Sequence, residues 1–220
     1  MQEKRQPVLR LPFSYSGPGP SLRGWNACRG GRNDALSPSP DMDRESAFVH
    51  FKHASDLIEH IKDRGGFHVA AACYPEGHVE AANKSEDIIN LKKKVDAGCE
   101  FLTTQMFFDN NVLYRFLYKL YAKGIAIPVL AGIMPVTNKK QIARIVRLSG
   151  TSLPPRFQNI LDRFGGDSAS MEEAGIAYAT EQIIDLVANG VRGVHLYTMN
   201  RPDIAGRIMA NLCHILGKTE

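Results

Sequence analysis

The sequence lacks both a long hydrophobic run and a closely spaced pair of cysteines. No apolar stretch approaches the roughly 20 residues that cross a bilayer, and the first residues lead into no apolar core of a secretory signal. The four cysteines lie far apart and form no CxxC pair, which is typical of reduced thiols. We therefore expect a cytoplasmic protein without membrane association, disulfides or a bound metal.

A strong excess of charge of one sign is also absent. The 27 basic and 23 acidic residues are spread along the whole chain and give a formal charge of +4. No basic stripe interleaved with aromatic residues marks a nucleic-acid surface, so we expect small-molecule chemistry and no nucleic acid. A chain of 220 residues, 44% of them hydrophobic, suits one globular domain.

The first 46 residues differ in composition from the rest. They are rich in proline, glycine, serine and arginine and show no sustained apolar period, so burial cannot offset the entropy of ordering them. We predict a disordered tail over residues 1–46 and a folded domain over residues 47–220. That domain should open with an amphipathic helix that starts near Ala47 and ends at Gly65.

Short apolar strands then alternate with amphipathic helices. The predicted strands cover residues 67–74, 101–107, 128–134 and 193–198, and the later helices cover residues 112–122, 155–164, 170–189 and 203–216. Such alternation is typical of a parallel sheet covered by helices. An open doubly wound sheet would fit the pattern too, but no GxGxxG follows a strand. We predict an α/β fold of the (β/α) TIM-barrel type. The predicted barrel is partial, because the sequence supplies four strands, whereas a full barrel has eight strands and about 250 residues.

Polar residues gather where the predicted strands end. Tyr74, Glu76 and His78 follow the first strand, Gln105 lies within the second, and Arg201 follows the fourth. Parallel α/β folds build their sites at the carboxyl ends of strands. An amide such as that of Gln105, set among apolar residues, also needs hydrogen-bond partners. We therefore expect the functional site at this end of the sheet.

Five motifs carry a resemblance to a known family. They are the segments 71–81 (AACYPEGHVEA), 87–98 (DIINLKKKVDAG), 104–109 (TQMFFD), 132–136 (GIMPV) and 195–201 (HLYTMNR). In this order they resemble the methylenetetrahydrofolate reductase family over about residues 49–216. The resemblance implies a barrel flavoprotein of one-carbon metabolism that binds FAD. Its reaction transfers a hydride from NADH or NADPH to 5,10-methylenetetrahydrofolate, giving 5-methyltetrahydrofolate.

The resemblance also implies a set of FAD contacts. They are Ala54, Tyr74, His78, Asp87, Asn90, Lys93 and Lys94. The spacing of three and four places Asp87, Asn90 and Lys94 on one helical face, and neighbouring lysines can neutralise a pyrophosphate. Without the neighbouring motifs, we would interpret the lysines at residues 92–94 as a solvated helix face and His78 as an ordinary loop histidine.

The folate site implied by the resemblance comprises Gln105, Gln141 and Arg201. An arginine suits the carboxylate tail of a folate because its fork binds carboxylates bidentately. Without the family motif, Arg201 would be a surface arginine, and Gln105 is equally well a buried structural amide. We interpret Glu76 as structural rather than as a proton donor. No catalytic residue is assigned, because the family's catalytic glutamate lies on a first barrel strand that this sequence lacks.

Two other hypotheses remain open. The chain could be a truncated, non-catalytic half-barrel, because four parallel strands leave two open edges and an apolar inner face. On either view we expect a homo-oligomer or a complementing chain. A different barrel enzyme, such as an aldolase with a phosphate site near the last strands, is disfavoured because no lysine lies in a predicted strand to form a Schiff base.

Overall fold

The computed structural model describes residues 51–216. The predicted tail and the predicted start of the first helix near Ala47 lie outside the described residues. The elements are α1 (Ala54–Arg64), β1 (Ala70–Cys73), α2 (Lys84–Asp96), β2 (Phe101–Thr104), α3 (Asn110–Ala122), β3 (Val129–Ile133), α4 (Lys139–Ser149), α5 (Pro155–Phe164), α6 (Ser168–Ala188), β4 (Val194–Leu196) and α7 (Pro202–Leu212). The predicted α/β class and the alternation of strands and helices are confirmed.

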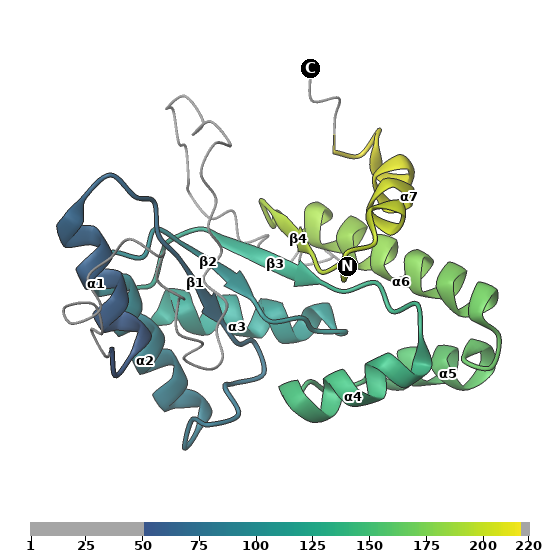
Figure 1. The fold of residues 1–220 in the computed structure, drawn as a ribbon, viewed down its shortest axis with the longest axis horizontal. Helices are drawn as coiled ribbons and strands as arrows, with labels where there is room; N and C mark the ends of the chain where they lie inside the picture. Colours follow the sequence, from purple (N-terminus) through teal and green to yellow (C-terminus); the bar gives the residue numbers. More distant parts are fainter. Residues whose placement is uncertain (1–50, 217–220) are drawn as a thin grey trace, which may run out of the picture.

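The strands form one parallel sheet in the order β1-β2-β3-β4. Each strand therefore lies beside its neighbour in sequence, with α1 and α2 near β1 and with α6 and α7 near β4 (Figure 1). A doubly wound sheet reverses its strand order partway along. The described strands show no such reversal.

One face of the sheet carries the main core. Ala71, Cys73, Leu102, Ala131 and Ile133 are buried on it, and the parallel register places them side by side. The helices contribute Ile58, Ile88, Leu91, Leu113, Phe116, Leu120, Ile176, Ile183, Leu186, Ile204 and Ile208. Because each fully buried aliphatic or aromatic side chain stabilises the fold by about 1.5–3 kcal/mol, α1, α2, α3, α6 and α7 are held against this face.

The opposite face of the sheet is only partly covered by the described residues. Strand residues alternate between faces, so this inner face carries Ala70, Ala72, Thr103, Leu130 and His195. Their side chains are half-buried or exposed. In a closed barrel, the corresponding face would fill the interior.

A second apolar cluster lies beyond the carboxyl ends of β2 and β3, where α4 and α5 are placed (Figure 1). Phe108 stacks on Phe157 with ring centroids 4.9 Å apart, and the Tyr178 hydroxyl donates to the Phe108 carbonyl at 2.6 Å. The partly buried residues Ile145 and Val146 of α4 pack against this cluster. Thus α4 and α5 build a wall beside the strand ends, and the longer α6 covers the sheet.

The strands are shorter than predicted. We predicted strands over residues 67–74, 101–107 and 193–198, whereas the ladders cover Ala70–Cys73, Phe101–Thr104 and Val194–Leu196. An apolar run does not distinguish a strand from a buried loop: Phe107 is fully buried after β2 has ended. The last helix likewise ends at Leu212 instead of residue 216.

The described residues contain no disulfide, since Cys73, Cys99 and Cys213 are free. Between residues 51 and 216 there is also no cluster of three or more potential metal ligands. No helix in the same range is long and apolar enough to cross a membrane.

Candidate functional site

The floor of the candidate site is a hydrogen-bonded node at the carboxyl ends of three strands. The Tyr197 hydroxyl, just after β4, donates to the Thr104 carbonyl of β2 at 2.9 Å. The Thr104 hydroxyl accepts from the backbone N–H of Gly132 in β3 at 2.8 Å. A Cβ on Gly132 would lie 2.7 Å from the Tyr197 ring. Tyr197 therefore crosses the sheet over a glycine.

Tyrosine 197 is neutral and acts as a hydrogen-bond donor in this node. Burial raises the pKa of Tyr197 to about 12. The His195 ring packs edge-on against Tyr197, with centroids 4.6 Å apart. Strand alternation places Gln105 on the same inner face as these two residues. The centre of the sheet's carboxyl end therefore carries two aromatic rings and the amide of Gln105, and charged residues lie around these groups.

The loop after β1 brings three predicted FAD contacts together. The rings of Tyr74 and His78 meet edge to face, with centroids 4.5 Å apart. The backbone N–H of His78 donates to the Asp87 carboxylate in α2 at 3.3 Å. Burial raises the pKa of Asp87, and the hydrogen bond from His78 partly offsets this. A fourth predicted contact, Ala54, begins α1, the helix that packs against α2.

The other predicted FAD residues on α2 have local partners. Lys93 Nζ donates to Asn90 Oδ1 at 3.1 Å on the exposed side of the helix. Lys94 Nζ instead donates to the carbonyl of Ala72 at 3.3 Å. Carbonyls alternate sides along a strand, and that of Cys73 bonds to the chain after β2, so the Ala72 carbonyl points to the free edge of β1. Lys94 therefore occupies a strand-edge acceptor.

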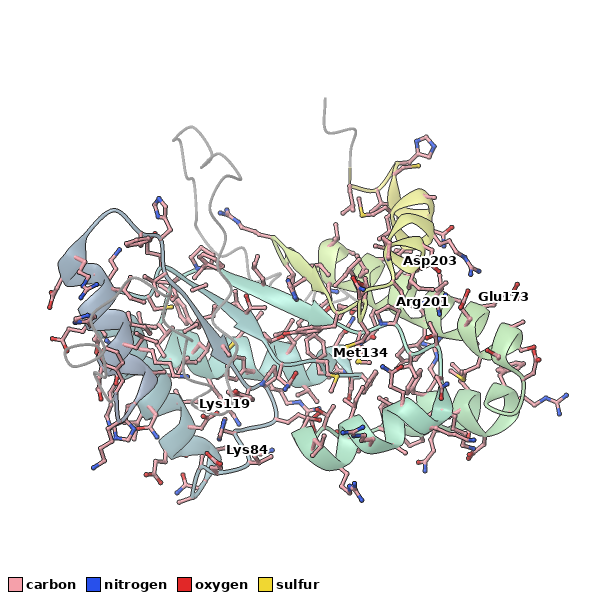
Figure 2. All side chains as sticks on the ribbon, viewed as in Figure 1. Lys84, Lys119, Met134, Glu173, Arg201 and Asp203 are labelled. Carbon is pink, nitrogen blue, oxygen red and sulfur yellow. The ribbon has the colours of Figure 1, made fainter. Side chains whose placement is uncertain are left out.

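The three predicted folate residues come from different elements. Gln105 follows β2, and its Oε1 accepts from the Met106 backbone N–H at 3.1 Å. Gln141 lies in the first turn of α4. Arg201 precedes α7, where Figure 2 shows it beside Asp203. No hydrogen bond joins the three predicted residues to one another within residues 51–216.

Contacts that the sequence did not reveal also shape the site. The Glu76 carboxylate accepts from the Ser152 hydroxyl at 2.7 Å and from its backbone N–H at 3.1 Å. This contact ties the loop after β1 to the segment after α4 and agrees with a structural role for Glu76. Glu172 of α6 pairs with Arg201 at 2.9 Å. Neither pairing has a spacing signal, because the partners lie on different elements far apart in sequence.

Comparisons with known proteins agree on one family. The model of the methylenetetrahydrofolate reductase family matches residues 32–213. The chain is 34% identical over 165 residues to the 5,10-methylenetetrahydrofolate reductase of Escherichia coli (strain K12), covering 75% of this chain and 54% of that protein. It is 33% identical over 173 residues to methylenetetrahydrofolate reductase (NADH) 1 of Zea mays, covering 74% and 29%. The chain thus spans about half the length, or less, of these relatives.

One solved structure is similar in fold. It is an uncharacterized protein from Clostridium thermocellum that binds two copies of 5-methyl-5,6,7,8-tetrahydrofolic acid. The TM-score is 0.52 at 17% identity, and the match covers 74% of this chain and 59% of that one. At this identity the likeness supports the fold alone.

Proposed function

The chain belongs to the methylenetetrahydrofolate reductase family, and from this premise we propose that it forms part of a flavin-dependent oxidoreductase. The proposed reaction reduces 5,10-methylenetetrahydrofolate to 5-methyltetrahydrofolate with NADH or NADPH, in the cytoplasm. The observation that carries the proposal is the grouping of Tyr74, His78 and Asp87 at the carboxyl end of β1, beside the lysines of α2. Sites of parallel α/β folds lie at this end.

The donor set at this place suits FAD. The Lys93 ammonium lies on the exposed side of α2 and supplies charge for a pyrophosphate. Asn90 offers an amide, and the half-buried Asp87 carboxylate can accept from a sugar hydroxyl. Tyr74 offers an aromatic surface. Lys94 would join the set if it released the Ala72 carbonyl. Charge and hydrogen-bonding capacity therefore match an anionic dinucleotide.

Each residue then has a binding or orienting task. FAD, when bound, would accept the hydride from the nicotinamide and pass it to the folate. Gln105, on the inner face, would bond the pterin edge, with Tyr197 fixing the floor beneath. Gln141 and Arg201 would hold the rest of the folate, the arginine taking its carboxylate tail. The protein would orient the reactants, while the cofactor carries the chemistry.

We further propose that the sheet is one part of a (β/α) barrel. Within residues 51–216, β1 and β4 each pair with one neighbour, and the inner face is partly exposed. Closing the barrel needs further strands. These would come from outside the described residues: from the same protein, a second copy of the chain or a complementing chain. The family's catalytic glutamate would lie on one of these strands.

Flavin retention by the purified full chain tests the proposal. We expect a yellow protein with flavin absorbance that is bleached by NADH or NADPH. Asp87→Asn should weaken FAD binding about ten- to one-hundredfold, the value of a charge-assisted hydrogen bond. Titration of FAD into the stripped protein measures this effect.

Asp96→Asn is the matched control, because Asp96 lies in the last turn of the same helix and pairs with Lys92 on the surface. It changes the charge equally and should leave FAD affinity unaltered. A folded, colourless protein that takes up no FAD would exclude the reductase proposal for this chain and favour a non-catalytic half-barrel.

A further inference from the structure

Arg201 is held by two carboxylates through a single nitrogen. Its Nη2 lies 2.9 Å from Glu172 Oε2 and 2.7 Å from Asp203 Oδ2, and Figure 2 shows Arg201 and Asp203 together where α7 begins, beside α6. A guanidinium has five N–H donors, two of them on Nη2. Both hydrogens of Nη2 are therefore engaged. Nε and Nη1 have no hydrogen-bond partner in the described part of the chain.

This arrangement blocks bidentate binding of a ligand. A guanidinium can present two parallel N–H donors along either of two edges, Nε with Nη2 or Nη1 with Nη2, because the Cδ methylene covers the third edge. Both edges include Nη2. A ligand carboxylate that binds as a fork must therefore take the place of Glu172 or Asp203.

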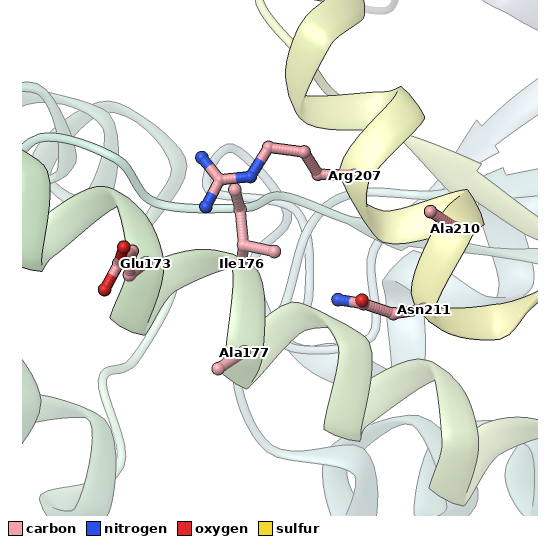
Figure 3. Close-up of a pocket in the computed structure, with 6 residues that line it drawn as sticks. All are labelled: Glu173, Ile176, Ala177, Arg207, Ala210 and Asn211. Carbon is pink, nitrogen blue, oxygen red and sulfur yellow. The ribbon is translucent and has the colours of Figure 1, made fainter.

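The two carboxylates differ in how firmly they are held. The Glu172 side chain is 24% exposed, and its second oxygen pairs with Nη1 of Arg207 at 2.6 Å. Figure 3 shows Arg207 extending from α7 towards α6. The Asp203 side chain is 54% exposed, and its one ion pair within residues 51–216 is with Arg201. Glu172 is thus anchored from two sides, and Asp203 is the partner that can leave.

We propose that Asp203 is an internal competitor for the carboxylate site of Arg201. A ligand with a carboxylate tail displaces Asp203 and takes over the Nη2 fork, while Glu172 and Arg207 keep the guanidinium in position. Asp203 then lowers the affinity for the tail without touching the reacting atoms. The identification of the ligand as a folate with a glutamate tail rests on the proposed function. The competition itself concerns any small ligand whose carboxylate binds the Arg201 guanidinium as a fork.

The test uses p-aminobenzoyl-L-glutamate, which carries the tail of a folate without the pterin, in calorimetric titrations of the full chain. Asp203→Asn should bind this fragment about two- to fivefold more tightly than the wild type, the scale of an exposed ion pair. Asp203→Ser should tighten fragment binding to the same extent. It serves as a second variant, because serine is a residue suited to a helix start. Arg201→Lys should weaken binding, since a lysine offers no fork.

Two controls make the result specific. Asp96→Asn removes the same charge at the far end of α2 and should leave fragment affinity unchanged. A tetrahydropterin without the tail should bind all Asp203 variants like the wild type. Unchanged or weaker fragment binding in both Asp203 variants, or no fragment binding by the wild type and either variant, would overturn the competition. Because the fragment needs no flavin, a protein that binds the fragment but takes up no FAD refutes the proposed function and not this inference.

Discussion

At the scale of single residues, one threonine joins three strands. Thr104 accepts from Gly132 through its hydroxyl and from Tyr197 through its carbonyl. The hydrogen bond from the Gly132 N–H to the Thr104 hydroxyl takes the place of a backbone bond in the ladder between β2 and β3. Strand β2 ends at Thr104. Because Thr104 is fully buried, losing either partner would leave a buried polar group without a hydrogen bond. This would reduce the free energy of unfolding by about 1–3 kcal/mol.

The close approach at Gly132 gives a prediction. A Cβ at this position would lie 2.2 Å from the Thr104 carbonyl oxygen and 2.7 Å from Tyr197. Neither atom is the end of a flexible side chain, so Gly132→Ala should reduce the free energy of unfolding by about 3 kcal/mol, the upper end of overpacking costs. Urea denaturation followed by circular dichroism measures the change.

Gly206 provides the matched substitution. It lies within α7, and a Cβ there meets nothing within 4 Å. Gly206→Ala should therefore stabilise the protein by about 0.5–1 kcal/mol through helix propensity. Equal effects of the two substitutions would show that the crossing of Tyr197 over β3 is not a close contact.

At the scale of elements, α4 and α5 form a unit with its own apolar cluster. Phe157 stacks on Phe108 and packs at a tilt against Tyr178, so one side chain of α5 contacts both the loop after β2 and the helix α6. Gly175 in α6 packs so closely that a Cβ would lie 1.9 Å from the Val136 carbonyl oxygen. The unit is thus attached to the strand ends where we propose the site.

Removing the central ring should loosen this unit selectively. Phe157 is 1% exposed, and Phe157→Ala should cost about 3–5 kcal/mol through lost burial and a cavity. Hydrogen exchange should accelerate in α4 and α5, while amides in β1 to β3 keep most of their protection.

Phe164, at the end of the same helix, is 39% exposed. Phe164→Ala should therefore cost only about 1 kcal/mol and leave the exchange pattern of α4 unchanged. Uniform acceleration across the sheet in Phe157→Ala would show that the two clusters unfold together.

At the scale of the whole molecule, the described sheet has one face covered by helices and one face partly exposed. The sheet is stabilised by the helix layer, whereas the inner face has few partners within residues 51–216. The Lys94 ammonium at the Ala72 carbonyl covers one acceptor of the β1 edge. Charged side chains at sheet edges oppose unspecific pairing. A closing strand would have to displace this contact.

Barrel closure gives a prediction at this scale. Ala70 lies at the start of β1 on the inner face. If other strands close the barrel, its interior is close-packed, and Ala70→Leu should reduce the free energy of unfolding by about 1–3 kcal/mol. Ala122→Leu, at the exposed end of α3, should change it by less than about 0.5 kcal/mol. Equal tolerance of both substitutions, measured by urea denaturation, would contradict a closed barrel.

Much of the element order could be predicted because periodic burial is a local property of the sequence. Helix α5 has the predicted bounds Pro155–Phe164, since a proline at the helix start and a glycine after its end are local signals. Strand ends were predicted less well, because an apolar run such as Met106–Phe108 is equally suited to a buried loop. A ladder ends where partners diverge, and that depends on the neighbouring strand.

The sequence by itself determined the parallel α/β class, the family and the candidate residues at the strand ends, because the periodicity of apolar residues and the order of the motifs are properties of the sequence alone. Tertiary structure alone decided which of these residues have which partners. It turned Lys94 to the β1 edge, joined Glu76 to Ser152, and placed Glu172 on Arg201. Such pairings depend on distances between elements, and sequence spacing carries no record of those distances.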